Sequence, residues 1–198
     1  TVAATDPEDD TVTFTVSGSE LSITSAGVLT FVSAPDYETK TSYRATVTAS
    51  DGTNTTNQNI TVNVNNINGA PIFSSDAALS ADENQTSIGT VTATDPEGDT
   101  LTFSVSGSDL SITSDGVLTF KSAPDYETKS SYSATLTVTD GSFTVTQAVA
   151  ITVLDVNEAP IFTSSAGFSA DENQTGIGTV TATDPEGDTL TFSVSGSD

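Results

Sequence analysis

Short runs of alternating apolar and polar residues recur along the whole chain. Leu101 to Val105, Val117 to Phe120 and Tyr132 to Val138 each have a period of two, and a turn rich in Gly, Asp, Ser or Pro follows each run. This period is typical of half-buried β-strands, because successive side chains of a strand point to opposite faces of the sheet. No long run has a helical period. The pattern therefore predicts an all-β fold.

The pattern also repeats at a fixed distance. Thr90 to Pro160 repeats Thr1 to Pro71 at a constant offset of 89 residues, and Thr179 begins a third copy. One period predicts about seven strands, which is the number and spacing of a two-sheet Greek-key sandwich. The predicted strands of the second period lie at 72–81, 91–94, 101–105, 110–112, 117–120, 132–138 and 149–153.

An Ala-Pro pair marks the predicted boundary between repeats, because the residue before a proline is driven into an extended conformation. We predict a first repeat at 1–70 that lacks its opening strand, a complete repeat at 71–159 and the start of a third at 160–198. The linkers are only a few residues long, so the sandwiches are expected to stack end to end. A repeat that begins a third time also indicates part of a longer array.

The composition narrows the possible partners. The chain has no Cys and no His, which disfavours disulfides and the usual zinc and haem sites. It carries 27 acidic and 4 basic residues, and the net charge of −23 repels nucleic acid and anionic membrane surfaces. No stretch approaches the ~20 apolar residues of a membrane span, and no signal peptide is recognisable, so no membrane insertion is expected. Multivalent hard cations with oxygen ligands are the expected partners.

Acidic motifs follow the predicted strands in the same order in each period. In the second period they read Ala81-Asp82-Glu83-Asn84, Ala93-Thr94-Asp95-Pro96-Glu97, Pro124-Asp125-Tyr126-Glu127, Thr139-Asp140-Gly141 and Asp155-Val156-Asn157-Glu158-Ala159-Pro160. This set resembles the cadherin repeat and its bacterial cadherin-like relatives, whose motifs read xEN, AxDxD, DRE, AxDxG and DxNDNxP. The resemblance implies cadherin- or Ig-like sandwiches that hold Ca²⁺ at the junctions between successive repeats.

By that resemblance, each junction draws its calcium ligands from two neighbouring repeats. The second junction would use Glu83, Asp125, Glu127, Asp155, the Val156 carbonyl, Asn157, Glu158, Asp184, Glu186 and Asp188. The first junction would use Asp36, Glu38, Asn68, Asp95, Glu97, Asp99 and Asp140, and the other candidate ligands are Asp6, Glu8, Asp10 and Asp51. Ca²⁺ suits such a set because it takes six to eight oxygen ligands. It would also offset the repulsion of packed carboxylates, about 1–4 kcal/mol per pair.

The two exit motifs differ at predicted ligand positions. Asn66 stands where the second exit has Asp155, and Gly69 stands where it has Glu158. We therefore expect the first junction to hold fewer ions and to be softer than the second. The second exit motif is also one residue shorter than the animal form, which bears on the number of ions.

The remaining charged residues have local explanations. Lys40, Arg44, Lys121 and Lys129 lie around the fifth predicted strand and the turn before it, where basic residues protect a sheet edge from pairing with another sheet. Asp109 and Asp115 fit no ligand position and are predicted to be solvated loop residues.

These observations favour a calcium-rigidified extender of a large extracellular protein, most simply a bacterial adhesin or surface filament. Catalysis is disfavoured, because there is no His, Cys or Trp and the same acidic pair recurs in each complete period. Two alternatives stay open. One is a cadherin-like module that binds cell-surface or matrix glycans or another partner. The other is self-association into a head-to-tail polymer, in which segment 161–178 of one chain completes the first repeat of the next.

Overall fold

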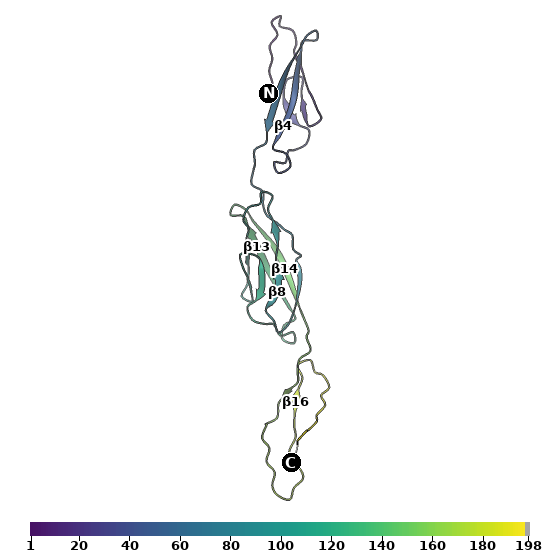
Figure 1. Ribbon diagram of the computed structural model, residues 1–198, viewed down its shortest axis with the longest axis vertical. Coiled ribbons are helices and arrows are strands. Elements are labelled where there is room, and N and C mark those ends of the chain that lie inside the picture. Colours follow the sequence, from purple (N-terminus) through teal and green to yellow (C-terminus); the bar gives the residue numbers. More distant parts are fainter. Residues whose placement is uncertain (197–198) are drawn as a thin grey trace. The chain divides into compact units, whose positions relative to one another are not determined.

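The structure is a computed structural model that describes residues 1–196, and every regular element in this range is a β-strand (Figure 1). The all-β prediction is therefore confirmed. The chain divides into two compact units, 1–69 and 70–198, next to the predicted boundary at Ala70-Pro71. The further division at residue 159 stays a prediction. The described residues contain no helix long and apolar enough to cross a bilayer.

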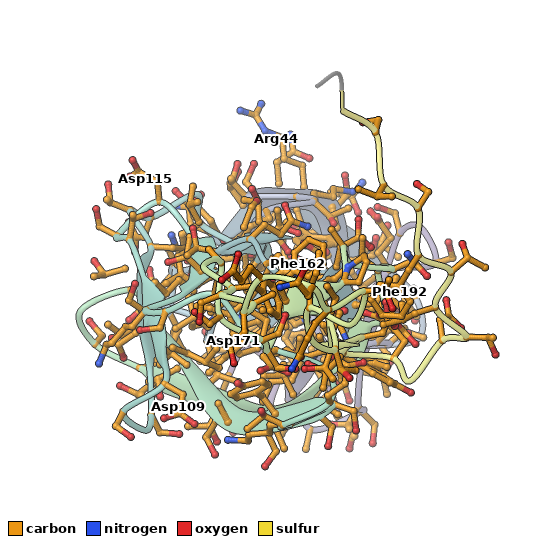
Figure 2. All side chains as sticks on the ribbon, turned by 90° about the horizontal axis from the view of Figure 1, so that it is seen from below. Arg44, Asp109, Asp115, Phe162, Asp171 and Phe192 are labelled. Carbon is orange, nitrogen blue, oxygen red and sulfur yellow. The ribbon has the colours of Figure 1, made fainter. Side chains whose placement is uncertain are left out.

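The first unit has one three-stranded sheet and one hairpin. The antiparallel sheet has the order β1 (Thr13–Val16), β4 (Ser42–Ser50), β5 (Thr55–Asn63), and the hairpin consists of β2 (Leu21–Ile23) and β3 (Leu29–Phe31). The alternation along β4 buries Val47 and Ala49, and Leu21 of β2 is also buried, while Arg44 points outward (Figure 2). The period of two in the sequence thus corresponds to side chains that point alternately into the core and toward solvent.

The second unit contains the complete sandwich. One sheet has the order β10 (Thr102–Val105), β13 (Ser131–Thr139), β14 (Thr144–Leu154), β7 (Ala78–Asp82), and Figure 1 labels β13 and β14. The other has the order β11 (Leu110–Ile112), β12 (Val117–Phe120), β8 (Ser87–Thr90). Leu118 of β12, Leu136 of β13 and Ile151 of β14 are at most 1% exposed and form the centre of the core.

The opening segment differs from its prediction as a single strand at 72–81. It forms β6 (Ile72–Phe73), which pairs with β9 (Ala93–Thr94), and then β7, which runs parallel to β14. A polar run after Phe73 separates the two strands, so the segment passes from the two-stranded β6–β9 sheet to the four-stranded sheet that contains β14. β8 is also absent from the predicted strands, because Ile88 is the single large apolar residue among its four positions.

The 89-residue period is visible in the strand registers. Thr13 pairs with Ser50 in the first unit, and the equivalent Thr102 pairs with Thr139 in the second. After residue 159, β15 (Ile161–Phe162) and β16 (Ala182–Thr183) repeat the register of β6 and β9.

Candidate metal centre

Four carboxylates from four separate segments meet in the second unit. Glu83 directly follows β7, Glu127 lies in the turn before β13, Asp155 directly follows β14 and Glu186 lies beyond β16. One carboxylate oxygen of each residue lies within 4.8 Å of the corresponding oxygens of the other three. All four belong to the ligand set predicted for the second junction. We call this group the carboxylate cluster.

Glu83 is the buried member of the carboxylate cluster, with 3% of its surface exposed. Its Oε2 accepts a hydrogen bond from the Tyr126 backbone N–H at 2.7 Å, and its Oε1 accepts one from the Val156 N–H at 2.8 Å. Buried carboxylates are strongly unfavourable without such partners. Its own N–H donates to the Leu154 carbonyl at 3.1 Å. Glu83 therefore holds the turn that contains Tyr126 beside the segment that leaves the sandwich at 155–160, which we call the exit segment.

The cluster carries excess negative charge. Burial and the charge of nearby Asp184 raise the pKa of Glu186, although backbone hydrogen bonds oppose the shift. Glu186 Oε1 accepts a hydrogen bond from the Glu158 N–H at 3.2 Å, whereas its Oε2 is buried without a hydrogen-bond partner. For Glu127, a hydrogen bond from its own backbone lowers the pKa, but burial and the charges of Glu83, Asp155 and Glu186 outweigh it and raise the pKa. A bound cation would reverse this repulsion.

The described ion pairs engage lysines with acids outside the cluster. Lys129 Nζ lies 2.8 Å from Asp109 Oδ2 and 3.9 Å from the centre of the Tyr132 ring. The first unit repeats the arrangement with Lys40 Nζ, Glu20 and Tyr43, at 2.5 Å and 4.4 Å. These lysines thus have specific partners besides any role in protecting a sheet edge. Asp109 and Asp115 lie at the periphery, as Figure 2 shows.

The raised pKa values predict a pH dependence in the absence of metal. A carboxyl group whose pKa is higher in the folded state than in the unfolded state favours folding below its unfolded pKa, and this contribution is lost as pH rises through the folded value. In EDTA, acidification from pH 7 to pH 5 should therefore raise the urea midpoint of the second unit. Asp109 does not interfere, because the hydrogen bond from Lys129 lowers its pKa from an ordinary value of 3.8.

The matched variant for this experiment is Glu127→Gln, which removes one of the two raised groups. Its urea midpoint should depend less on pH than that of the unchanged chain. A midpoint that falls or stays constant between pH 7 and pH 5 in the unchanged chain would contradict the raised pKa values.

The acidic turns after the second predicted strand are organised by their first aspartate. Asp95 Oδ1 accepts hydrogen bonds from the backbone N–H groups of Glu97 and Asp99 at 3.0 and 3.1 Å. Equivalent bonds join Asp6 to Glu8 and Asp10, and Asp184 to Asp188. Asp95 Oδ2 is buried without a hydrogen-bond partner. One oxygen thus shapes the turn, and the role of Asp95 as a calcium ligand stays a prediction.

Asp125 and Asp140, two other predicted ligands, shape their own turns. Asp125 accepts hydrogen bonds from the Thr128 N–H and Oγ1 at 3.0 and 2.9 Å. Asp140 Oδ1 accepts them from the N–H groups of Ser142 and Phe143 at 2.6 and 2.5 Å. Neither belongs to the carboxylate cluster. Their role as ligands stays a prediction.

The same local bonds recur at equivalent positions of the first unit. The Thr39 hydroxyl donates to Asp36 at 2.9 Å and lowers the pKa of that aspartate. The backbone N–H groups of Asn54 and Thr53 donate to Asp51 and lower its pKa. Ligands predicted for the first junction lie on both units, which are described separately, so this site stays a prediction. Besides Asp36, the ligands predicted for the first junction are Glu38, Asn68, Asp95, Glu97, Asp99 and Asp140.

The exit segment includes a contact that the predicted ligand set missed. Asn84 Nδ2 donates a hydrogen bond to Glu158 Oε1 at 2.6 Å, and Asn157 Nδ2 donates to the Glu158 carbonyl at 3.1 Å. The Asn of the xEN motif was the available signal for Asn84. The backbone donor of Tyr126 had no signal in the sequence, because any residue type except proline carries an N–H.

The second sandwich is similar in sequence to bacterial proteins. Residues 68–152 match the family described as "Bacterial Ig domain". Chitinase A of Pseudoalteromonas piscicida is 32% identical to this chain over 139 residues. That match covers 69% of this chain, and the chain spans only 17% of the length of the chitinase.

Solved structures with a similar fold include several cadherin ectodomains. Mouse cadherin-23 EC22–24 gives a TM-score of 0.58 at 26% identity, with coverage of 92% of this chain and 69% of that chain. Protocadherin gamma B2 extracellular cadherin domains 3–6 give 0.59 at 25% identity, with coverage of 91% and 52%. Human protocadherin-24 EC1–2 gives 0.58 at 21% identity, with coverage of 76% and 85%. The fold is therefore cadherin-like, which confirms the resemblance drawn from the five motifs.

Proposed function

We propose that this chain is a calcium-rigidified extender segment of a large extracellular bacterial protein, such as an adhesin or surface filament. The observation that carries the proposal is the carboxylate cluster, in which Glu186 Oε2 is buried without a hydrogen-bond partner. The likeness to cadherin extracellular domains and to the bacterial Ig domain supports an extracellular setting.

The donor set of the cluster fits calcium. All four members offer carboxylate oxygens, the ligands that hard cations prefer, and Ca²⁺ tolerates irregular geometry with mono- or bidentate carboxylates. The remaining ligands would come from predicted neighbours, namely Asp125, the Val156 carbonyl, Asn157, Glu158, Asp184 and Asp188. Calcium would supply positive charge, which neutralises the cluster and gives Glu186 Oε2 a partner.

The origin of the four side chains explains how an ion would stiffen the chain. Glu83, Glu127 and Asp155 belong to the complete sandwich, whereas Glu186 comes from the segment after it. An ion held by all four would tie that segment to the sandwich. Extracellular repeats with such sites typically bind calcium with dissociation constants of ~10⁻⁴–10⁻³ M. The tie would then form at extracellular calcium levels and stay open where calcium is scarce.

Calcium should raise the stability of the second unit. An ion that binds only the folded state adds about 2.7 kcal/mol to the free energy of unfolding at a hundredfold excess over the dissociation constant. The measurement is urea unfolding of the full chain in calcium and in EDTA, followed by NMR signals of β13 and β14.

Two variants make the calcium experiment specific. Glu127→Gln removes one negative charge from the carboxylate cluster and should lose most of the calcium effect. Asp115→Asn removes the same charge at an exposed loop position and should keep it. Equal midpoints of the unchanged chain in calcium and in EDTA would refute the proposal.

A second candidate function is that of an accessory module in a polysaccharide-binding protein. The match to a segment of chitinase A favours it, whereas the absence of Trp removes the residue that most often stacks on sugars. Co-sedimentation of the full chain with chitin tests this candidate. Binding in both calcium and EDTA would support it, and no binding in either would exclude chitin as the ligand.

A further inference from the structure

Asn84 links the start of the complete sandwich to its exit. Its φ of 62° lies in the left-handed region, which Asn adopts more readily than most residues. Its backbone N–H donates to the Pro124 carbonyl at 2.9 Å, and its Nδ2 donates to Glu158 Oε1 at 2.6 Å. Two adjacent residues thus hold the exit segment, because Glu83 contacts Val156 and Asn84 contacts Glu158.

Glu158 contacts the following segment through its backbone. Its N–H donates to Glu186 Oε1 at 3.2 Å, while its carboxylate accepts the hydrogen bond from Asn84. The carboxylate of Glu158 is not a member of the carboxylate cluster. The side chain of Glu158 therefore fixes the position of its own backbone, and that backbone contacts a cluster carboxylate.

We propose that Asn84 and Glu158 form a positioning pair that holds Glu186 at the carboxylate cluster before a cation binds. The inference rests on the proposed calcium function. Glu158 then acts by accepting a hydrogen bond and not as a calcium ligand, the role that the family resemblance implies. Hydrogen bonds to a charged acceptor are about twice as strong as neutral ones. Groups that orient metal ligands typically change metal affinity by about 10- to 100-fold when they are removed.

The positioning pair distinguishes the exit motif of the second repeat from that of the first. The position equivalent to Glu158 in the first repeat is Gly69, which has no carboxylate that could accept such a bond. The third segment retains the asparagine as Asn173, with a similar φ of 70°. Asn173 therefore offers a matched control, because it has a similar backbone conformation, whereas the asparagine that donates to Glu158 is Asn84.

The test compares substitutions that separate hydrogen bonding from charge. Glu158→Gln keeps an oxygen that accepts a bond from Asn84, whereas Glu158→Ala removes it. Asn84→Gly removes the amide and keeps a residue that tolerates the left-handed backbone. Calcium affinity is measured on the full chain by titration with CaCl₂, followed by the NMR signals of the Val156 and Glu158 amides.

Affinity should stay within about twofold for Glu158→Gln and fall about tenfold for Glu158→Ala and for Asn84→Gly. The double variant Asn84→Gly with Glu158→Ala should be no weaker than either single variant, because both remove one interaction. Asn173→Gly should leave the affinity unchanged. A loss in Glu158→Gln as large as in Glu158→Ala would show that the charge itself binds the ion and would overturn the positioning pair.

A second measurement, made in EDTA, separates this inference from the calcium proposal. The pair forms without metal, so Asn84→Gly should increase hydrogen exchange of the Glu158 amide by about 10-fold or more, the effect of losing one hydrogen bond to a charged acceptor. Unchanged exchange would overturn the pair even in a chain that binds calcium. Increased exchange in a chain that binds no calcium would support the pair and refute the calcium function alone.

Discussion

Replacement of Glu83 by alanine is expected to destabilise the complete sandwich by about 2–6 kcal/mol even without calcium. The substitution leaves the part-buried N–H groups of Tyr126 and Val156 without their acceptor, and each donor that loses its partner in this way costs about 1–3 kcal/mol. A domain of this size is stable by only about 5–15 kcal/mol. The measurement is urea unfolding in EDTA, followed by NMR signals of β13 and β14.

The equivalent residue of the third segment provides the control for this prediction. Glu172 is exposed, and surface substitutions of this kind usually change stability by less than about 0.5 kcal/mol. Glu172→Ala should therefore unfold at the same urea concentration as the unchanged chain. If Glu83→Ala did so too, Glu83 would not hold the turn and the exit segment together.

Replacement of Gly116 by alanine is expected to lower the stability of the same sandwich by about 2–5 kcal/mol. Gly116 has a φ of 88°, and a Cβ built on it would lie 2.2 Å from the Val91 carbonyl oxygen. Val91 is 2% exposed and its N–H donates to the Gly116 carbonyl at 2.8 Å, so this backbone cannot easily move aside. Left-handed strain contributes about 1–2 kcal/mol and overpacking about 1–3 kcal/mol.

Gly107 separates the two contributions to this effect. Its φ of 92° is similar, but a Cβ there would meet no atom within 4 Å. Gly107→Ala should therefore show the strain alone, about 1–2 kcal/mol. Equal losses for Gly107→Ala and Gly116→Ala in urea unfolding would show that the clash with Val91 is relieved by a small movement.

The strands could be predicted from the sequence where one of their faces is buried and the other is exposed. Alternation marks β10, β12 and β13, because one face of each strand packs on the core and the other meets water. The opening segment could not be read this way. β6 and β7 pair with different sheets, and the polar residues between them are compatible with either a loop or an exposed strand.

The candidate site was only partly accessible from the sequence. The motif resemblance identified Glu83, Glu127, Asp155 and Glu186, which the fold brings together from distant positions. The same motifs contain Asp125, whose side chain is engaged in its own turn. Carboxylates favour turns and metal ions alike, so residue type alone does not separate the two roles.

The parallel pairing of β7 and β14 determines how the complete sandwich would respond to mechanical tension. Ala78 pairs with Ala150 at one end of the contact, and Asp82 pairs with Leu154 at the other. Tension along the chain pulls β7 toward its N-terminus and β14 toward its C-terminus, so the strands are loaded lengthwise and in opposite directions. The backbone hydrogen bonds between the two strands must then break together instead of one after another. In a protein that carries load, this arrangement would make the separation of β7 from β14 a cooperative step.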